Sequence, residues 1–287
     1  ASAGACLRDE LFADPLVCVS WSNLPRVQVQ ELANGLQISG NWAFVSGCTL
    51  ASHVGGAVVL PPLQPGGPPR QVVALVPVAQ ATIVETWDPI GLGGTGSHDV
   101  RFDNVFVPHS RTFTWPAAAP APDVDYPPKV FVPGVWFISN CAAATHLGLA
   151  RRALDEARQE MRGKLERYSL QPVLEHASTQ RSLEAGEGLW FACRAGLREA
   201  LRAVADSALR GEPLSQEQRL NARVAAVTAV HRSAEVVRIA YDAAGAGAIR
   251  RSGVLERLLR EASCLTHHIS ANLPSYEQTG RVRSGVD

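Results

Sequence analysis

The pattern of hydrophobic and polar residues changes character near residue 130. Before that point, short apolar or alternating runs are separated by glycine and proline, which is typical of β-strands joined by turns. The predicted strands cover residues 16–21, 36–39, 42–46, 57–60, 71–77 and 100–107. Pro-rich breaks at 61–69 and 116–128 argue against long helices in this part of the chain.

After residue 130, apolar residues recur at the spacing of amphipathic helices. The predicted helices cover residues 135–161, 178–209, 215–243 and 253–268. We therefore predict an α+β fold: an antiparallel β-barrel or sandwich domain over residues 1–130, followed by a four-helix bundle over residues 131–287. The charge-rich stretch 151–167 is predicted to be a solvated helix face.

Composition narrows the range of partners and compartments. Lys+Arg and Asp+Glu number 27 each, so no nucleic-acid partner is expected. The longest apolar runs, such as 54–62, are too short to cross a bilayer, and the N-terminus lacks a signal pattern, so no membrane association is expected. The six scattered cysteines include no C-x-x-C pair, which predicts neither a disulfide framework nor a metal site and favours a reducing cytoplasm.

Two glycine-flanked segments in the predicted β-domain carry candidate chemistry. Residues 40–48 read GNWAFVSGC, and residues 86–100 read TWDPIGLGGTGSHDV. Glycines let a backbone approach a ligand closely, and the hydroxyls of Ser46, Thr95 and Ser97 offer short hydrogen-bonding arms. A single Gly-rich loop before a strand is more often a turn than a ligand site. The occurrence of two such segments favours a ligand.

In their order and spacing, these segments resemble the flavin-contacting β-domain of the acyl-CoA dehydrogenase superfamily. The resemblance implies FAD or FMN as the cofactor. The cofactor-binding residues that it implies are Trp42, Phe44, Ser46, Gly47, Thr95, Gly96 and Ser97. The alternative for Trp42 and Phe44 is that both are core aromatics of a β-sandwich. Many relatives carry an arginine where this chain has Gly93, which removes a fixed cation from the implied site.

The C-terminal segment bears on the type of reaction. Residues 258–261 (LLRE) resemble the family's Arg-Asp near the start of its last helix. In acyl-CoA dehydrogenases a glutamate further along this helix removes the substrate's α-proton, and the corresponding position here is Ile269. The stretch 137–144, where other dehydrogenases carry the base, also lacks an acid. A dehydrogenase without such a base should be very slow, so this activity is the least favoured.

The neighbouring pair His267-His268 instead resembles the flavin-dependent oxygenase branch of the family, in which a histidine on this helix faces the flavin. The resemblance implies a monooxygenase that takes reduced flavin from a separate reductase. It would act on an aromatic, heteroaromatic or amine small molecule through a flavin C4a-hydroperoxide. His268, or in second place His267, would be the catalytic residue that binds the peroxide or takes a substrate proton. The alternative is a histidine exposed at a helix end.

Other features leave alternatives open. Relatives carry a helical domain ahead of the β-domain, and the absence of that domain here predicts a fragment, a subunit that works with a partner, or a chain that has dispensed with it. A non-catalytic, partner-dependent or flavin-free descendant, for example in a natural-product pathway, therefore stands beside the monooxygenase. The resemblance also implies a homotetramer centred on the helical domains.

A few weaker features complete the picture. The turn 244–247 (AGAG) resembles a family turn near the flavin nucleotide, or is simply a helix end. His146 lies in an apolar helix and is predicted to be a core residue, while His53, His109 and His231 are given no role.

Overall fold

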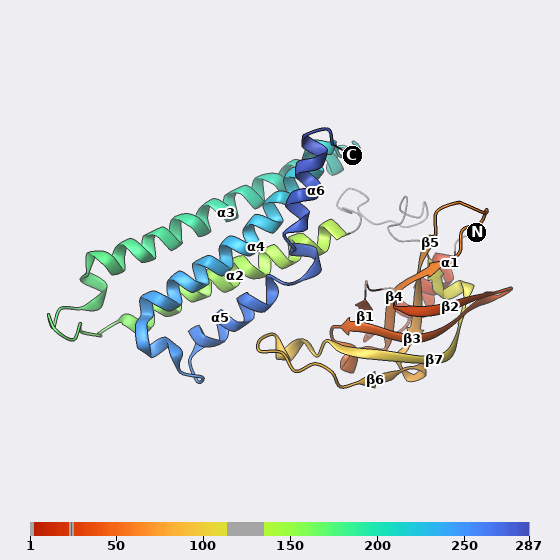
Figure 1. Ribbon diagram of the computed structural model, residues 1–287, viewed down its shortest axis with the longest axis horizontal. Helices are drawn as coiled ribbons and strands as arrows, with labels where there is room; N and C mark the ends of the chain where they lie inside the picture. Colours follow the sequence, from red (N-terminus) through yellow and green to blue (C-terminus); the bar gives the residue numbers. More distant parts are fainter. Residues whose placement is uncertain (1–2, 23, 25, 114–134, 287) are drawn as a thin grey trace. The chain divides into compact units, whose positions relative to one another are not determined.

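The computed structural model describes residues 3–22, 24, 26–113 and 135–286. Within these residues the chain forms two compact units (Figure 1). The β unit holds the residues up to 89 together with 93–113, and the helical unit holds 90–92 and the residues from 135 onward. The boundary predicted at 130/131 falls outside the described residues, so the domain limits stay a prediction.

The β unit contains two four-stranded sheets, preceded by the short helix α1 (Ala3–Phe12). The first sheet has the order β1-β4-β5-β8, with bounds Val19–Ser22, His53–Leu60, Arg70–Pro77 and Thr112–Phe113. The second has the order β2-β3-β7-β6, with bounds Val27–Leu32, Gly35–Val45, His98–Pro108 and Thr82–Val84. The two strands predicted at 36–39 and 42–46 are one strand, β3, with register shifts in place of a turn.

The two sheets share one hydrophobic core and form a sandwich; among the described strands no closed barrel occurs. The core takes Leu36, Ile38 and Trp42 from β3, and Val54 and Val58 from β4. Strand pairing is antiparallel except between β1 and β4, which run parallel. The predicted α+β class and sandwich are confirmed, while the barrel alternative and a wholly antiparallel arrangement are wrong.

Trp42 lies at the centre of this core. It is completely buried, and its ring meets that of Phe102 edge to face with centroids 4.6 Å apart. On another side the ring lies directly against Gly56, where an added Cβ would come within 2.4 Å of it. Position 56 therefore has to be glycine because the tryptophan fills the space that any side chain would need.

The helical unit contains four long or medium helices and a short C-terminal one (Figure 1). They are α2 (Val135–Met161), α3 (Ala177–Leu209), α4 (Gln216–Ala244), α5 (Val254–Leu265) and α6 (Pro274–Arg283). Helix α4 contacts the other four, and its buried face is rich in alanine and valine, which lets neighbouring helices approach closely. The predicted helices are confirmed to within a residue or two, apart from the end of α5.

The turn between α3 and α4 begins α4 with a capping box. Ser215 accepts from the Gln218 amide, and the Gln218 side chain accepts from the Ser215 amide. Gln218 also donates to Ser207 Oγ at 2.8 Å, which joins the end of α3 to the start of α4. The bundle's turn is therefore specified by local polar contacts as well as by its core.

Helix α5 ends at Leu265, three residues before its predicted end, and α6 was not predicted. The extended backbone of His268 begins a short 3-10 turn, η7 (Ile269–Ala271), so both histidines follow the helix and do not lie on it. Pro274 opens α6 at its first turn, a position that proline favours, and this signal could have identified the helix.

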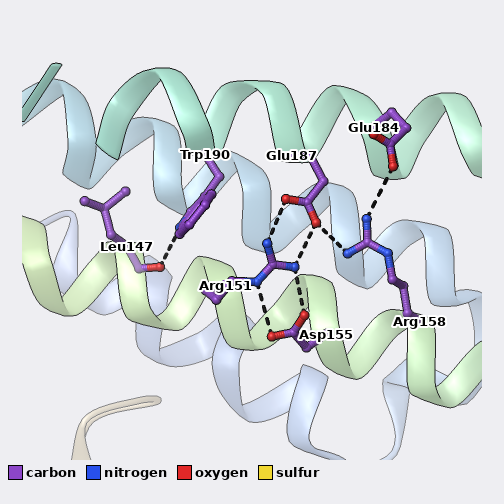
Figure 2. Close-up of polar contacts among 7 residues, drawn as sticks. All are labelled: Leu147, Arg151, Asp155, Arg158, Glu184, Glu187 and Trp190. Atoms are coloured by element: carbon purple, nitrogen blue, oxygen red, sulfur yellow. Dashed lines mark hydrogen bonds and ion pairs between the residues drawn. The ribbon is translucent and has the colours of Figure 1, made fainter. Parts of the chain in front are cut away.

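An ion-pair network joins α2 to α3 (Figure 2). Arg151 donates two hydrogen bonds to Glu187, at 2.7 and 2.8 Å, and two to Asp155. Glu187 also accepts from Arg158 at 2.6 Å, and these three side chains are partly buried. Arg151 lies over the ring of Trp190, which donates to the Leu147 carbonyl. This part of the charge-rich stretch 151–167 is thus an interhelical contact and not only the solvated face that was predicted.

In the part of the chain that the structure describes, every helix is too short or too polar to traverse a lipid bilayer.

Candidate functional site

The end of β3 turns one aromatic side chain outward. A register shift between Trp42 and Val45 breaks the alternation of the strand, so Trp42 and Ala43 are both buried. Phe44 has a φ of 56° and is 58% exposed, which is unusual for a large aromatic residue. Its ring meets that of Trp87 edge to face, with centroids 6.0 Å apart. The β unit therefore presents an aromatic surface beside the predicted hydroxyl residues.

Trp42, by contrast, belongs to the core. Its side chain has no exposed surface, and it is enclosed by Phe102 and Gly56. The sequence left open whether Trp42 contacts a flavin or packs in the core. In the structure it packs in the core, because the register shift in β3 turns Trp42 inward and Phe44 outward. We do not include Trp42 among the proposed flavin contacts.

The hydroxyls of the two glycine-flanked segments form one cluster. Ser46 Oγ lies 2.7 Å from Ser97 Oγ, and Ser97 Oγ lies 2.8 Å from Thr95 Oγ1. Ser97 is buried, whereas Ser46 and Thr95 are exposed. Ser97 therefore connects the other two from behind, and each of these bonds limits the direction in which the outer hydroxyls can point.

Backbone contacts hold the two segments together. The Gly47 amide donates to the Thr95 carbonyl at 2.8 Å, and Gly47 and Gly96 both have positive φ. Cys48 Sγ lies 3.6 Å from the Gly96 carbonyl. Six of the seven predicted cofactor-binding residues, all except Trp42, thus lie in one neighbourhood of the β unit.

Two residues that the sequence analysis left without a role hold the loop in place. The Trp87 amide donates to His98 Nδ1 at 3.2 Å, and Thr86 Oγ1 accepts from the Asp99 amide at 3.1 Å. Both contacts pair the start of the loop with the start of β7. An aromatic residue and a threonine just before a Gly-rich loop are the signal that could have marked them.

The histidines lie in the helical unit, in the turn after α5. His267 and His268 are both exposed to solvent. His268 caps η7, because its Nδ1 accepts from the Ser270 amide at 3.3 Å, and the same atom lies 2.6 Å from Ser270 Oγ. Partial desolvation of the ring lowers the pKa of His268 below its ordinary value of 6.5, which favours the neutral imidazole.

Side chains of α2 and α4 anchor this turn. Ser139 Oγ donates to the Ser270 carbonyl at 2.6 Å, and His231 Nε2 donates to the Ala271 carbonyl at 2.9 Å. His231, to which the sequence assigned no role, is thus a structural partner of the turn. His146 is completely buried, and its Nδ1 contacts the Ala142 carbonyl at 3.0 Å, which agrees with its predicted place in the core. Burial lowers the pKa of His146.

The positions at which a dehydrogenase would carry its base hold no carboxylate. Ile269, in η7, is 56% exposed and apolar. Arg260 on α5 is bonded to Glu256 one turn earlier and donates to the Ile90 carbonyl, which belongs to the same compact unit. The stretch 244–247 forms the end of α4 and the start of a 3-10 turn, where Gly245 has a φ of 69°. Among the described residues, no group of His, Cys, Asp and Glu side chains is placed to hold a metal ion.

Comparisons with known proteins agree with this architecture. Residues 140–273 match the family described as acyl-CoA dehydrogenase, C-terminal domain. The oxygenase component of an FADH2-dependent resorcinol hydroxylase from Rhizobium sp. is 32% identical over 90% of this chain and 66% of its own. The oxygenase subunit HsaA, a flavin-dependent monooxygenase from Rhodococcus jostii, is 30% identical over 91% of this chain and 69% of its own.

A solved structure, that of 3-HSA hydroxylase from Rhodococcus sp. RHA1, superposes with a TM-score of 0.87 at 23% identity, over 99% of this chain and 74% of that one. Two domains of matching order, with the hydroxyl cluster in the first and the histidine turn in the second, define an acyl-CoA dehydrogenase-like flavoprotein fold. The chain belongs to the acyl-CoA dehydrogenase superfamily, in its branch of flavin-dependent monooxygenases. It spans 66% of the length of the resorcinol hydroxylase component.

Proposed function

We propose that this chain is the oxygenase component of a reduced-flavin-dependent monooxygenase that acts on an aromatic, heteroaromatic or amine-bearing small molecule. The observation that carries the proposal is the cluster of Ser46, Ser97 and Thr95 beside the exposed ring of Phe44. An isoalloxazine requires a flat apolar neighbour and hydrogen-bonding groups at one edge, and these residues supply both. Bound reduced flavin would supply the electrons that activate dioxygen.

The residues of the β unit have separate parts in this proposal. Phe44 would lie against the flavin ring, and Ser46 and Thr95 would hydrogen-bond its polar edge. Ser97 is buried and would orient the other two. Gly93 has no heavy atom within 4 Å of an added Cβ, so an arginine is sterically possible there and its absence is a chemical difference from many relatives.

In the helical unit, His268 would bind an oxygen atom of the substrate or oxidant, and His267 is the second candidate. The proposal does not include dehydrogenation of an acyl-CoA, because neither Ile269 nor the stretch 137–144 provides a carboxylate for the α-proton. The similarity to the oxygenase component of a resorcinol hydroxylase favours an aromatic substrate.

The choice of flavin, the reductase partner and the oligomeric state are proposed from the resemblance to the same family. We propose FAD as the first flavin to test and FMN as the second, with a separate reductase supplying the reduced form. A homotetramer is proposed through the helical unit, where an apolar groove between α3 and α4 is lined by Leu189, Ala192, Val224 and Ala225. Cys18, Cys48, Cys141, Cys193 and Cys264 are free thiols, which supports a cytoplasmic location.

The test is anaerobic titration of the protein with FADH2 and FMNH2, comparing wild type with Ser46→Ala. Loss of one hydrogen bond should weaken binding about three- to tenfold. Ser39→Ala is a matched control, because Ser39 lies on β3, the strand that Ser46 follows, and is bonded to Asn104 instead. Wild-type protein that binds neither reduced flavin would contradict the proposal and favour a flavin-free descendant.

Turnover is tested separately with resorcinol, dioxygen labelled with the heavy isotope, and a flavin reductase. The expected result is one labelled oxygen atom in the product. Flavin binding without oxygen transfer to any aromatic or amine probe would favour the non-catalytic or partner-dependent alternative.

A further inference from the structure

The imidazole of His268 is held by two groups of one residue. Ser270 Oγ lies 2.6 Å from His268 Nδ1, and the Ser270 amide donates to the same nitrogen at 3.3 Å. Ser270 is only 5% exposed, so water does not readily replace either contact. The Nδ1 side of the His268 ring is therefore in contact with Ser270 of the same turn.

These contacts decide which ring nitrogen carries the proton. A backbone amide can only donate, so the nitrogen that it faces must be unprotonated. If Nδ1 carried the proton, the N–H groups of Nδ1 and of Ser270 would point at each other. With Nδ1 as the acceptor, the Ser270 hydroxyl also donates to it, and the proton of a neutral ring must lie on Nε2. The lowered pKa of His268, caused by desolvation, supports the neutral form.

The position of Ser270 is itself determined by other helices. Its carbonyl accepts from Ser139 Oγ of α2 at 2.6 Å, and the next carbonyl, that of Ala271, accepts from His231 Nε2 of α4 at 2.9 Å. Both Ser270 and Ala271 are buried. The turn therefore cannot rotate to offer His268 a carbonyl in place of the amide without breaking these bonds.

We infer that Ser270 is a positioning residue that holds His268 as a neutral imidazole with its proton on Nε2. In this state His268 donates a hydrogen bond through Nε2 to an oxygen atom of the substrate or oxidant, and it does not remove a proton from the substrate by that nitrogen. The part of this inference that concerns the reaction rests on the proposed monooxygenase function. The part that concerns the ring itself does not.

The tautomer can be measured directly, without flavin. Protein labelled with ¹⁵N in histidine gives two-bond proton–nitrogen correlation patterns that distinguish protonated from unprotonated ring nitrogens. The His268 signals are identified by their loss in His268→Gln. At a pH at which the ring is neutral, we expect wild-type Nδ1 to be unprotonated and Nε2 to be protonated. A wild-type ring protonated on Nδ1 would overturn the inference, whether or not any variant folds.

Ser270→Ala tests the assigned cause. Loss of the shorter contact should bring the two His268 nitrogen shifts toward each other, as the tautomers begin to mix. Ser263→Ala is the control, because Ser263 lies on α5 and donates to Leu259. Ser270→Thr keeps the hydroxyl and should restore the wild-type pattern. A folded Ser270→Ala protein with an unchanged His268 pattern would remove the Ser270 hydroxyl from the positioning role, because only the amide contact remains in that variant.

Activity separates this inference from the proposed function. Ser270→Ala should lower kcat about tenfold, less than the loss that removal of an acid–base group typically causes, and leave KM largely unchanged. If wild type shows the expected tautomer but binds no reduced flavin, the proposed function fails and the account of the ring stands. If wild type turns over with Nδ1 protonated, the function stands and this inference fails.

Discussion

The hydroxyl oxygens of Ser46 and Ser97 lie 2.7 Å apart, although 51 positions separate the two residues in the sequence. Ser46 follows β3, and Ser97 directly precedes β7, the strand that pairs with β3. Sheet pairing thus brings two glycine-flanked segments together, and Ser97 then links them from within. The predicted flavin contacts become one surface only through this pairing.

Ser97→Ala should weaken the hydroxyl cluster of Ser46, Ser97 and Thr95 by removing its buried member. The variant removes both hydroxyl contacts but leaves Ser46 and Thr95 at the surface, where water can replace the lost bonds. We therefore expect a modest stability loss of about 0.5–1.5 kcal/mol. Reduced-flavin affinity should fall about three- to tenfold, because Ser46 and Thr95 lose their orientation. Urea unfolding and anaerobic titration measure the two effects, and unchanged affinity would show that Ser97 has no orienting part.

Gly56→Ala should disturb the sandwich core. An added Cβ would lie 2.4 Å from the Trp42 ring, which is itself enclosed by Phe102. Such overpacking costs about 1–3 kcal/mol. The free energy of unfolding is measured by denaturant titration, with tryptophan fluorescence as the probe of unfolding. Gly188→Ala on α3 is the control, because nothing lies within 4 Å of its added Cβ and alanine favours a helix. Equal stability of the two variants would contradict this packing.

The Arg151–Glu187 contact predicts a pH-dependent contribution to stability (Figure 2). Hydrogen bonds from Arg151, and then from Arg158, hold the pKa of Glu187 below its ordinary value of 4.5. A carboxyl group with a lowered folded-state pKa stabilises the fold above the unfolded pKa, and that stabilisation is lost as the pH falls through the folded value. Glu187→Gln should thus cost about 1–3 kcal/mol at neutral pH and progressively less below pH 4.5.

The control for this variant is Asp242→Asn, which removes an exposed i,i+4 pair with Arg238. Such a pair contributes little to stability. If the two variants lose the same stability at neutral pH, the partly buried network is no stronger than an ordinary surface pair.

The buried His146 predicts loss of stability in acid. Burial lowers its folded-state pKa from the ordinary value of 6.5, so below that pH the unfolded chain binds the proton more readily. Stability should fall as the pH drops below 6.5 and level off beneath the folded-state value. Coulombic repulsion from the imidazoles of His231 and His268 adds to the lowering of the His146 pKa. His146→Gln should reduce the pH dependence of the unfolding free energy between pH 5 and 7 (about the histidine range).

Exposed His109 provides the comparison for His146. His109→Gln should leave the acid dependence unchanged, because it replaces an exposed side chain and leaves His146 buried in the core. A steep loss of stability below pH 6.5 that survives in His146→Gln would assign the effect to other groups.

Local pattern was enough to predict most elements of this fold. Apolar periodicity identified α2, α3 and α4 to within a residue or two, because their buried faces recur at helical spacing. Alternation and proline breaks located the main strands, because buried and exposed residues alternate along a strand that has one face in the core. The end of α5 was misplaced, because the helix gives way after Leu265 to a turn in which the extended backbone of His268 begins η7, and apolar spacing does not record such a turn.

By itself, the sequence determined the α+β order of the chain, the two glycine-flanked segments, and through them the family. Only the tertiary structure decided that Trp42 is core while Phe44 faces outward, that Ser97 is a buried link, and that Ser270 holds His268. The physical reason is the distance along the sequence between the residues that interact. Periodicity reflects burial along one element, whereas a register shift, a hydroxyl cluster and an anchored turn depend on residues that meet only after the elements have packed.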